Sequence, residues 1–233
     1  MYFTMDSSFL PMVRLADETA IEPPYVHKKR VPGEWIVYLI KKGEMYLEEN
    51  GVSYDLRTGD FLLLNPSLCH QGRRASRCEY FYIHFAHPDI HMVEADECRM
   101  REEMYKVRSA ALKSDACCMS ADSGSTGHTL LLPKYCRIAD EAVYASVLQN
   151  LHDIRAANCD HMEYYKALCG CRFLQMLVQV SRSCLSAELE RSGMVTARSY
   201  KKVLEVQNYL QSCYQEQITG DLLADRFDMN FDY

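Results

Sequence analysis

The sequence predicts an α+β fold in which an antiparallel β-barrel or jelly roll is followed by helices. Strand-like segments separated by glycine-containing turns follow one another between about residues 25 and 85, as in small closed antiparallel sheets. After about residue 94, the apolar side chains recur at intervals of three and four residues instead. That spacing is typical of amphipathic helices.

The strand predictions rest on β-branched and aromatic residues bounded by turn signals. Lys41-Lys-Gly43 and Arg57-Thr-Gly-Asp60 both indicate turns. Asn50-Gly51 favours a tight hairpin, because both central residues of such a turn must adopt positive φ. The predicted strands cover residues 35–40, 45–48, 53–56, 61–64 and 80–85.

The region after the barrel is expected to be mainly helical, with a small polar loop at 114–127 inside it. One predicted helix covers about residues 94–112, and a second carries an apolar stripe from Val143 to Ile154. A third, at about 160–189, has a heptad-like seam that we expect to join two copies into a homodimer. The alternative is that this helix only covers its own barrel. The predicted dimerisation residues are Tyr165, Cys169, Phe173, Met176 and Val180.

The C-terminal segment has the outline of a helix-turn-helix whose last helix is missing. A short helix over 218–227 has Thr219 placed as its N-cap. A turn follows, and Asn230 can cap a further helix just before the sequence stops at Tyr233. The predicted domains are therefore a barrel at 1–92, a helical dimerisation region at 93–190 and an incomplete helix-turn-helix domain at 195–233.

Composition limits the classes of function. The net charge is −6, whereas a chain that binds phosphates by itself should carry a basic surplus. No apolar run reaches membrane-spanning length and the N-terminus lacks a secretory pattern, so we expect a cytoplasmic protein. The 11 cysteines lack the two-residue spacer of common zinc and redox motifs, which favours buried or idle thiols.

Two segments resemble the AraC/XylS family of transcription regulators. Gly59-Asp-Phe-Leu-Leu-Leu-Asn-Pro-Ser-Leu-Cys-His70 is similar to the second cupin motif, in which an apolar strand ends in a proline and a histidine at the barrel mouth. The C-terminal segment resembles the start of the family's first helix-turn-helix. The matching residues there are Ile218, Thr219, Leu223, Ala224, Phe227, Asn230 and Tyr233.

This resemblance implies an effector-responsive, DNA-binding transcription regulator with a cupin-like barrel for a small molecule. The chain would be its ligand-sensing and dimerisation portion, because the family has two helix-turn-helix units and here the first is incomplete. Thr219, Asn230 and Tyr233 are expected at the DNA-binding surface of the full-length protein. The basic residues that contact phosphates would lie beyond Tyr233, which explains the acidic balance.

The resemblance also points to an effector pocket. Tyr80, Tyr82 and His84 alternate onto one face of their strand. Tyr80 and Tyr82 fall where sugar-binding members place a histidine and a tryptophan, and Arg30 falls near a sugar-binding arginine. An arginine beside aromatic faces suits a sugar or sugar acid. The predicted ligand-binding residues are Arg30, Tyr38, His70, Tyr80 and Tyr82.

Alternatives remain open for these residues. Tyr80 and Tyr82 could fill the barrel interior, Arg30 could be a solvated surface charge, and Trp35 could join the pocket if the strand phase allows it. Cupin enzymes hold a metal with several histidines and a glutamate, and His27, Glu34 and His70 are an incomplete set. We therefore expect no metal, no cofactor and no enzyme activity. The competing functions are a cupin isomerase or dioxygenase and a stand-alone sugar-binding module.

Overall fold

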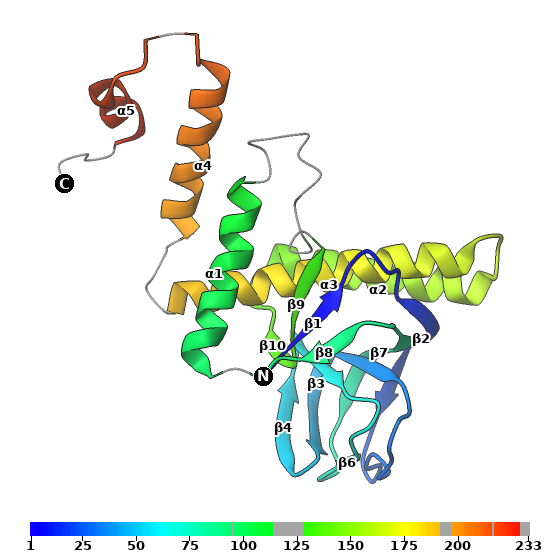
Figure 1. Cartoon of the computed structure of the whole chain (residues 1–233). Coiled ribbons are helices and arrows are strands. Elements are labelled where there is room, and N and C mark those ends of the chain that lie inside the picture. The colour runs from blue at the N-terminus through cyan, green and yellow to red at the C-terminus, as the bar shows by residue number, and fades with distance from the viewer. Residues whose placement is uncertain (95, 114–127, 192–196, 216, 229–233) are drawn as a thin grey trace. The chain divides into compact units, whose positions relative to one another are not determined.

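The chain contains an antiparallel β-barrel, two long helices on its outer face and a separate helical part (Figure 1). The computed structural model describes residues 1–94, 96–113, 128–191, 197–215 and 217–228. It divides into one compact unit of residues 1–98 and 122–184 and another of residues 99–121 and 185–233. The fold is α+β, with an antiparallel barrel followed by helices, as predicted.

The described strands form a three-stranded sheet in the order β8-β1-β9 and a larger sheet in the order β10-β5-β3-β7-β2, with β4 and β6 paired to β3. All the pairings between named strands are antiparallel. The strands are β1 (Tyr2–Asp6), β2 (Met12–Ile21), β3 (Trp35–Glu49), β4 (Val52–Arg57), β5 (Asp60–Leu64), β6 (His70–Gly72), β7 (Cys78–Ala86), β8 (Ile90–Met92), β9 (Thr129–Pro133) and β10 (Tyr135–Arg137).

Strand β3 runs through the segment where the sequence predicted a turn at residues 41–43, so that prediction is wrong. The register against β7 shifts between Ile40 and Lys42, and Gly43 has φ +82°. A Cβ atom at Gly43 would lie 2.2 Å from the carbonyl oxygen of Arg77, so only glycine fits this close approach. The irregularity bends β3, and its two halves pair with different neighbours.

The other two turns form where the sequence placed them. Asn50 and Gly51 both have positive φ and connect β3 to β4, as a tight hairpin requires. Gly59, with φ +86°, connects β4 to β5. Strand β3 is thus followed by two short connections, to β4 and from β4 to β5. The residues that adopt positive φ in these turns set where each strand begins.

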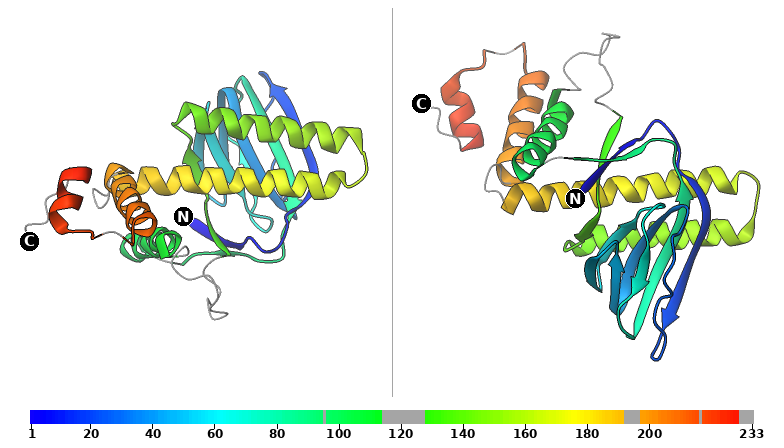
Figure 2. Two further views of the ribbon diagram at one scale, coloured as in Figure 1. Left: turned by 90° about the horizontal axis from the view of Figure 1, so that it is seen from above. Right: turned by 60° about the horizontal axis from the view of Figure 1, so that its bottom comes forward.

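The helices are α1 (Glu97–Lys113), α2 (Glu141–Asp160), α3 (Tyr165–Arg191), α4 (Ala197–Ser212) and α5 (Gly220–Phe227). In both views of Figure 2, α2 and α3 lie side by side along the barrel. Helix α2 begins at the N-cap Asp140, whose side chain accepts from the backbone N–H groups of Ala142 and Val143. It buries Val147, Leu151 and Ile154, which confirms the predicted stripe.

The seam of α3 faces inward, against the chain's own barrel. Cys169, Phe173, Met176 and Val180 are fully buried in one apolar cluster with the outer face of β7 and with α2. The Phe173 and Phe85 rings meet edge to face with centroids 4.7 Å apart. The heptad-like spacing of α3 therefore reflects its packing on the barrel of the same chain. The four buried side chains are not accessible to a second copy. Tyr165 is partly buried at the edge of the same cluster.

In the second unit, α4 and α5 form a short helical pair. The rings of Tyr209 and Phe227 lie 5.7 Å apart, and the Arg226 guanidinium lies over the Tyr209 ring at 4.4 Å. Thr219 is the N-cap of α5, as predicted, because its side chain accepts from the Leu222 N–H. Asn230 and Tyr233 lie outside the described residues, as does the predicted loop at 114–127. No helix in the described part of the chain is long and apolar enough to cross a membrane.

Candidate functional site

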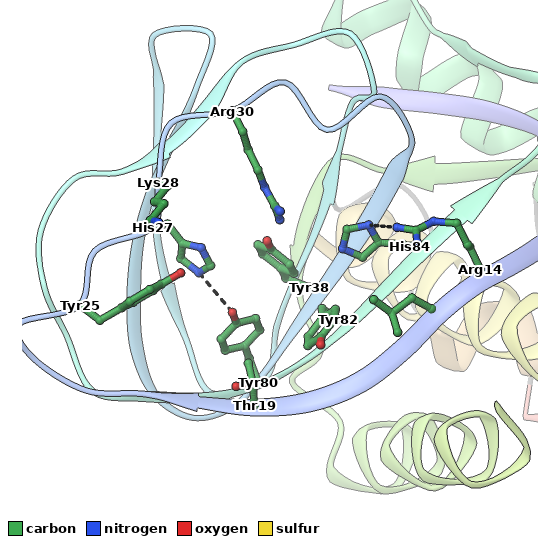
Figure 3. A pocket seen from close by; sticks show the side chains of 11 residues that line it. Arg14, Thr19, Tyr25, His27, Lys28, Arg30, Tyr38, Tyr80, Tyr82 and His84 are labelled. Carbon is green, nitrogen blue, oxygen red and sulfur yellow. Dashed lines mark hydrogen bonds between the residues drawn. The ribbon is translucent and has the colours of Figure 1, made fainter. Parts of the chain in front are cut away.

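The barrel interior holds a pocket of about 460 Å³ that opens to solvent (Figure 3). Strand β7 supplies one wall through Tyr80, Tyr82 and His84, while Phe81, Ile83 and Phe85 point to the outer apolar cluster. The predicted alternation is therefore correct. The pocket is lined by Arg14, Leu15, Thr19, Tyr25, His27, Lys28, Arg30, Tyr38, Tyr80, Tyr82 and His84.

The strands beside β7 set which residues join this wall. Tyr38 on β3 lies opposite Tyr82, and Thr19 on β2 lies opposite Tyr80. Directly opposed residues of an antiparallel pair share a face, so Tyr38 and Thr19 also point inward. Trp35 is an odd number of residues from Tyr38 and points outward, where its ring meets Phe3 at 5.3 Å. It is not part of the pocket.

The aromatic rings form a connected group. The Tyr38 and Tyr80 rings have centroids 5.2 Å apart, and Tyr82 follows at 6.2 Å from Tyr80. His27 stacks on Tyr38 at 5.8 Å, and its Nε2 lies 3.3 Å from the Tyr80 hydroxyl. Burial raises the pKa of the hydroxyls of Tyr38, Tyr80 and Tyr82. These hydroxyls therefore remain protonated donors at neutral pH.

Arg30 enters the pocket from the loop before β3, and Figure 3 shows its side chain extending toward Tyr38. The residue is exposed overall, but its Nε donates to Nε2 of His70 at 3.3 Å. The two residues also exchange backbone hydrogen bonds of 3.0 and 2.9 Å. His70 is fully buried and does not line the pocket; it lies behind Arg30 and holds it.

A second cation, Arg14, is neutralised within the site. It forms an ion pair with Glu34, with Nε to Oε2 at 2.6 Å, and Glu34 also contacts Nδ1 of His84 at 2.7 Å. Hydrogen bonding from Arg14 lowers the pKa of Glu34 to about 2, while burial is the main cause that lowers the pKa of His84. Glu34 is therefore a stable anion that offsets the charge of Arg14.

The histidines of this region are neutral at ordinary pH. Burial, together with the nearby Arg30 charge, lowers the pKa of both His27 and His70 to about 4. Since Arg30 Nε can only donate, the neutral His70 accepts at Nε2 and carries its proton on Nδ1. That Nδ1 is buried and has no hydrogen-bond partner in the structure as described.

The three residues considered as potential metal ligands, His27, Glu34 and His70, each form hydrogen bonds with other side chains. His27 contacts Tyr80, Glu34 contacts Arg14 and His84, and His70 accepts from Arg30. Among the described residues, no group of three or more His, Cys, Asp and Glu side chains could hold a metal ion. What the arrangement offers is hydrogen-bond donors, three cationic side chains and ring faces, which is the chemistry of small-molecule recognition.

The structure brings together Arg30, Tyr38, Tyr80 and Tyr82, four of the five predicted ligand-binding residues. Prediction missed Arg14 and Thr19, because no strand was expected before residue 25 and β2 arrives only through its pairing with β7. It also missed Lys28 and Tyr25, which lie in a loop without periodicity. His27 and His84 had signals, as a potential metal ligand and through the alternation of their strand.

Comparison with known proteins bears on this pocket directly. Residues 17–105 match the family model of the AraC-like ligand binding domain. This segment is therefore similar to the AraC-like ligand-binding domain. The match covers most of the barrel strands that line the pocket, from β2 to β7. The resemblance inferred from residues 59–70 is thereby confirmed for the barrel.

One curated protein matches over more of the chain than the family model does. The uncharacterized HTH-type transcriptional regulator YisR of Bacillus subtilis (strain 168) is 24% identical over 216 residues, which is 90% of this chain and 65% of that protein. The chain thus spans a little under two thirds of that relative's length.

Two solved structures are also similar. ToxT from Vibrio cholerae has 11% identity and a TM-score of 0.34, over 93% of this chain and 72% of that chain. A predicted oxalate decarboxylase from Thermotoga maritima has 19% identity and a TM-score of 0.29, over 32% of this chain and 67% of that chain.

Proposed function

We propose that the chain is the ligand-sensing portion of an effector-responsive, DNA-binding transcription regulator. The observation that carries this proposal is a solvent-accessible pocket lined by polar and aromatic side chains inside an AraC-like ligand-binding domain. The relative named as an HTH-type transcriptional regulator aligns with 90% of the chain. Both observations support a regulator in which the barrel binds a small molecule.

The effector of this proposal is a hydroxylated or anionic small molecule, such as a sugar or a sugar acid. Arg30 and the hydroxyls of Tyr80 and Tyr82 would meet its oxygens, and the rings would contact its C–H surfaces. Tyr38 lies deeper and would contact the effector at the bottom of the pocket. His70 would act through Arg30 instead of touching the effector.

DNA binding is proposed for the C-terminal helices. Helix α5 is a short capped helix that packs on α4 through Tyr209 and Phe227, consistent with the first helices of a helix-turn-helix. Thr219 would lie at the N-terminal end of α5, where backbone N–H groups can face a phosphate. Asn230 and Tyr233 keep their expected DNA-binding role as a proposal only, since they are outside the described residues.

A homodimer is proposed through the exposed face of the α2–α3 hairpin. Met162 is 66% exposed and Leu168 is 51% exposed, and they line a hollow of about 380 Å³ between the two helices. Tyr165 borders the same hollow. This surface replaces the buried seam as the means by which two copies would associate, because exposed apolar side chains gain most from being covered.

A cupin enzyme is the competing function, and we propose that the chain is not one. Support comes from the engaged state of His27, Glu34 and His70, each of which already has a partner inside the site. A stand-alone sugar-binding module is the third hypothesis for the function. It would share the pocket but have no effect on transcription.

The test uses the full-length gene product, tagged and expressed in its own host. Chromatin immunoprecipitation should enrich discrete DNA segments, and Tyr82→Ala should change transcription of the adjacent genes without lowering the amount of protein. Tyr135→Ala makes the same chemical change at an exposed site outside the pocket and should leave transcription unchanged. Absence of enrichment above an untagged control would contradict the regulator and favour the binding module.

A further inference from the structure

The pocket contains positive charge that no carboxylate balances. Arg30 and Lys28 both line it, and neither takes part in an ion pair anywhere in the described part of the chain. Arg14 provides the contrast within the same pocket, since Glu34 neutralises it. A cation directed into a partly enclosed site without a counter-charge favours an anionic ligand.

His70 fixes the direction in which Arg30 presents its guanidinium. The Nε of Arg30 is occupied by His70, and the backbone of the two residues is joined by two hydrogen bonds. The terminal nitrogens of Arg30 therefore remain for the pocket, and Figure 3 shows them above the Tyr38 ring. A guanidinium held in this way has less freedom to lose when it binds a planar acidic group.

The segment that carries Lys28 and Arg30, and the segment hydrogen-bonded to it, contribute no carboxylate to the pocket. Residues 23–33 and 65–78 contain no acidic residue, although the chain as a whole has a net charge of −6. Gly72 lets the two segments meet, because its N–H donates to the His27 carbonyl at 2.9 Å and a Cβ there would lie 2.6 Å from His27 N. In the second segment, Arg73 and Arg77 are paired with Asp55 and Glu22, so the unbalanced charge at the pocket is that of Lys28 and Arg30.

The neighbouring histidines add no positive charge to the pocket, so its unbalanced charge is that of Arg30 and Lys28. Burial lowers the pKa of His27 and His70 to about 4, so both are neutral at pH 7. The rest of the lining is aromatic, with the Tyr80 and Tyr82 rings 6.2 Å apart along one wall. A ligand that satisfies this site has an acidic group at one end and a flat or ring-shaped body at the other.

We propose that the effector is a small carboxylate, whose acidic group lies between Arg30 and Lys28 and whose body lies against the rings of Tyr80 and Tyr82. This deepens the proposed function, because it rests on the pocket being the effector site. It narrows the effector from hydroxylated or anionic molecules to acids, and it assigns His70 as the positioning residue for Arg30. The volume of about 460 Å³ is in the range that metabolite-sized ligands occupy.

The experiment compares acids with their neutral counterparts on the purified full chain. Calorimetric titration uses two matched pairs, galacturonate with galactose and 4-hydroxybenzoate with 4-hydroxybenzamide. Three proteins are compared: wild type, Arg30→Gln and the control Lys29→Gln, which removes an equal charge from the same loop outside the pocket lining. We expect only acids to bind, Arg30→Gln to weaken them on the order of tenfold, and Lys29→Gln to change affinity less than about twofold.

A second measurement covers the case in which neither acid binds. Sodium phosphate, compared with sodium chloride at equal ionic strength, should raise the melting temperature of wild type and Lys29→Gln in a saturable way. Arg30→Gln should lose the saturable part. Equal responses of wild type and Arg30→Gln in both measurements would overturn the proposal.

Two further outcomes separate this proposal from the proposed function. Binding of a neutral member as tightly as its acid would overturn the carboxylate while leaving the pocket as an effector site. The DNA enrichment experiment does not depend on the charge of the effector. For His70, we expect His70→Leu to weaken the acid and His70→Gln, which can still accept from Arg30, to restore binding. Unchanged acid binding by a folded His70→Leu protein would remove its positioning role.

Discussion

The two faces of strand β7 differ in chemistry although their residues alternate along one chain segment. Phe81, Ile83 and Phe85 face outward and are sealed beneath α2 and α3. Tyr80, Tyr82 and His84 face inward and line an open pocket. The outer face is apolar and closed, whereas the inner face keeps hydroxyls and cations accessible. One sheet thus separates stability from recognition, because its side chains point alternately to opposite sides.

The largest effect should come from the outer face. Phe173→Ala removes a fully buried ring that meets Phe85 at 4.7 Å, and we expect it to lower the free energy of unfolding by about 3–5 kcal/mol. Chemical denaturation measures this loss, and calorimetry on the folded fraction should show ligand affinity nearly unchanged. An equally large change in affinity would mean that the two faces are not energetically separate.

The inner face should make stability depend on pH. His27 and His70 have pKa values lowered to about 4 in the folded chain, from an ordinary 6.5. The unfolded chain therefore binds more protons between these values, and stability is complete above pH 6.5 and falls as the pH drops toward 4. We expect a loss of about 3 kcal/mol between pH 6.5 and 5, summed over the two histidines and measured by denaturation at several pH values.

The control is the slope of the free energy of unfolding plotted against pH. His70→Gln should reduce this slope by about half between pH 6.5 and 5, because His27 still titrates there, whatever the effect of the substitution on stability at pH 7. The lowered pKa of Glu34, about 2, acts only at more acidic pH, so it cannot produce the same slope. A wild-type curve that is flat between pH 6.5 and 5 would contradict the neutral histidines.

A smaller effect is expected from one hydroxyl of the inner face. Tyr80→Phe keeps the ring but removes the hydroxyl that lies 3.3 Å from His27 Nε2. We expect a loss of about 1 kcal/mol in the free energy of unfolding, which is typical of one intramolecular hydrogen bond. Thermal melts can detect this difference. A loss similar to that of Phe173→Ala would indicate that the inner face carries core stability as well.

The smallest change in the stability of a single chain should come from the exposed side of α3. Leu168 is 51% exposed, so Leu168→Glu should alter the free energy of unfolding by less than about 0.5 kcal/mol. If the α2–α3 hairpin joins two copies, the same variant should be monomeric in light scattering at concentrations where wild type is dimeric. A Leu168→Glu protein that remains dimeric would exclude this surface as the interface.

Local signals in the sequence predicted many of the elements. Asn50-Gly51 and Gly59 define turns through their positive φ, and Thr219 begins α5 as its N-cap. The period-two pattern of residues 80–85 separated inward from outward side chains, and the stripe on α2 gave its buried face. Each of these depends on residues close together in the chain. Their geometry follows from backbone preferences and side-chain spacing.

Long-range pairing had no such signal. Strands β1 and β2 are paired by residues more than 55 positions away, so neither was predicted and Arg14 was missed. The seam of α3 has the same spacing whether it meets a barrel or a second copy, and only the fold shows that Phe173 meets Phe85.

The sequence by itself determined the hairpin turns at Asn50-Gly51 and Gly59, several of the barrel strands and the N-cap Thr219, because these depend on local backbone preference. It also placed Tyr80 and Tyr82 on one face. Only the tertiary structure decided that His70 lies behind Arg30, since the two are 40 residues apart and meet through an isolated antiparallel bridge. Which charges remain unpaired in the pocket is likewise a property of the folded chain, because a carboxylate neutralises a cation only where folding brings the two within contact distance.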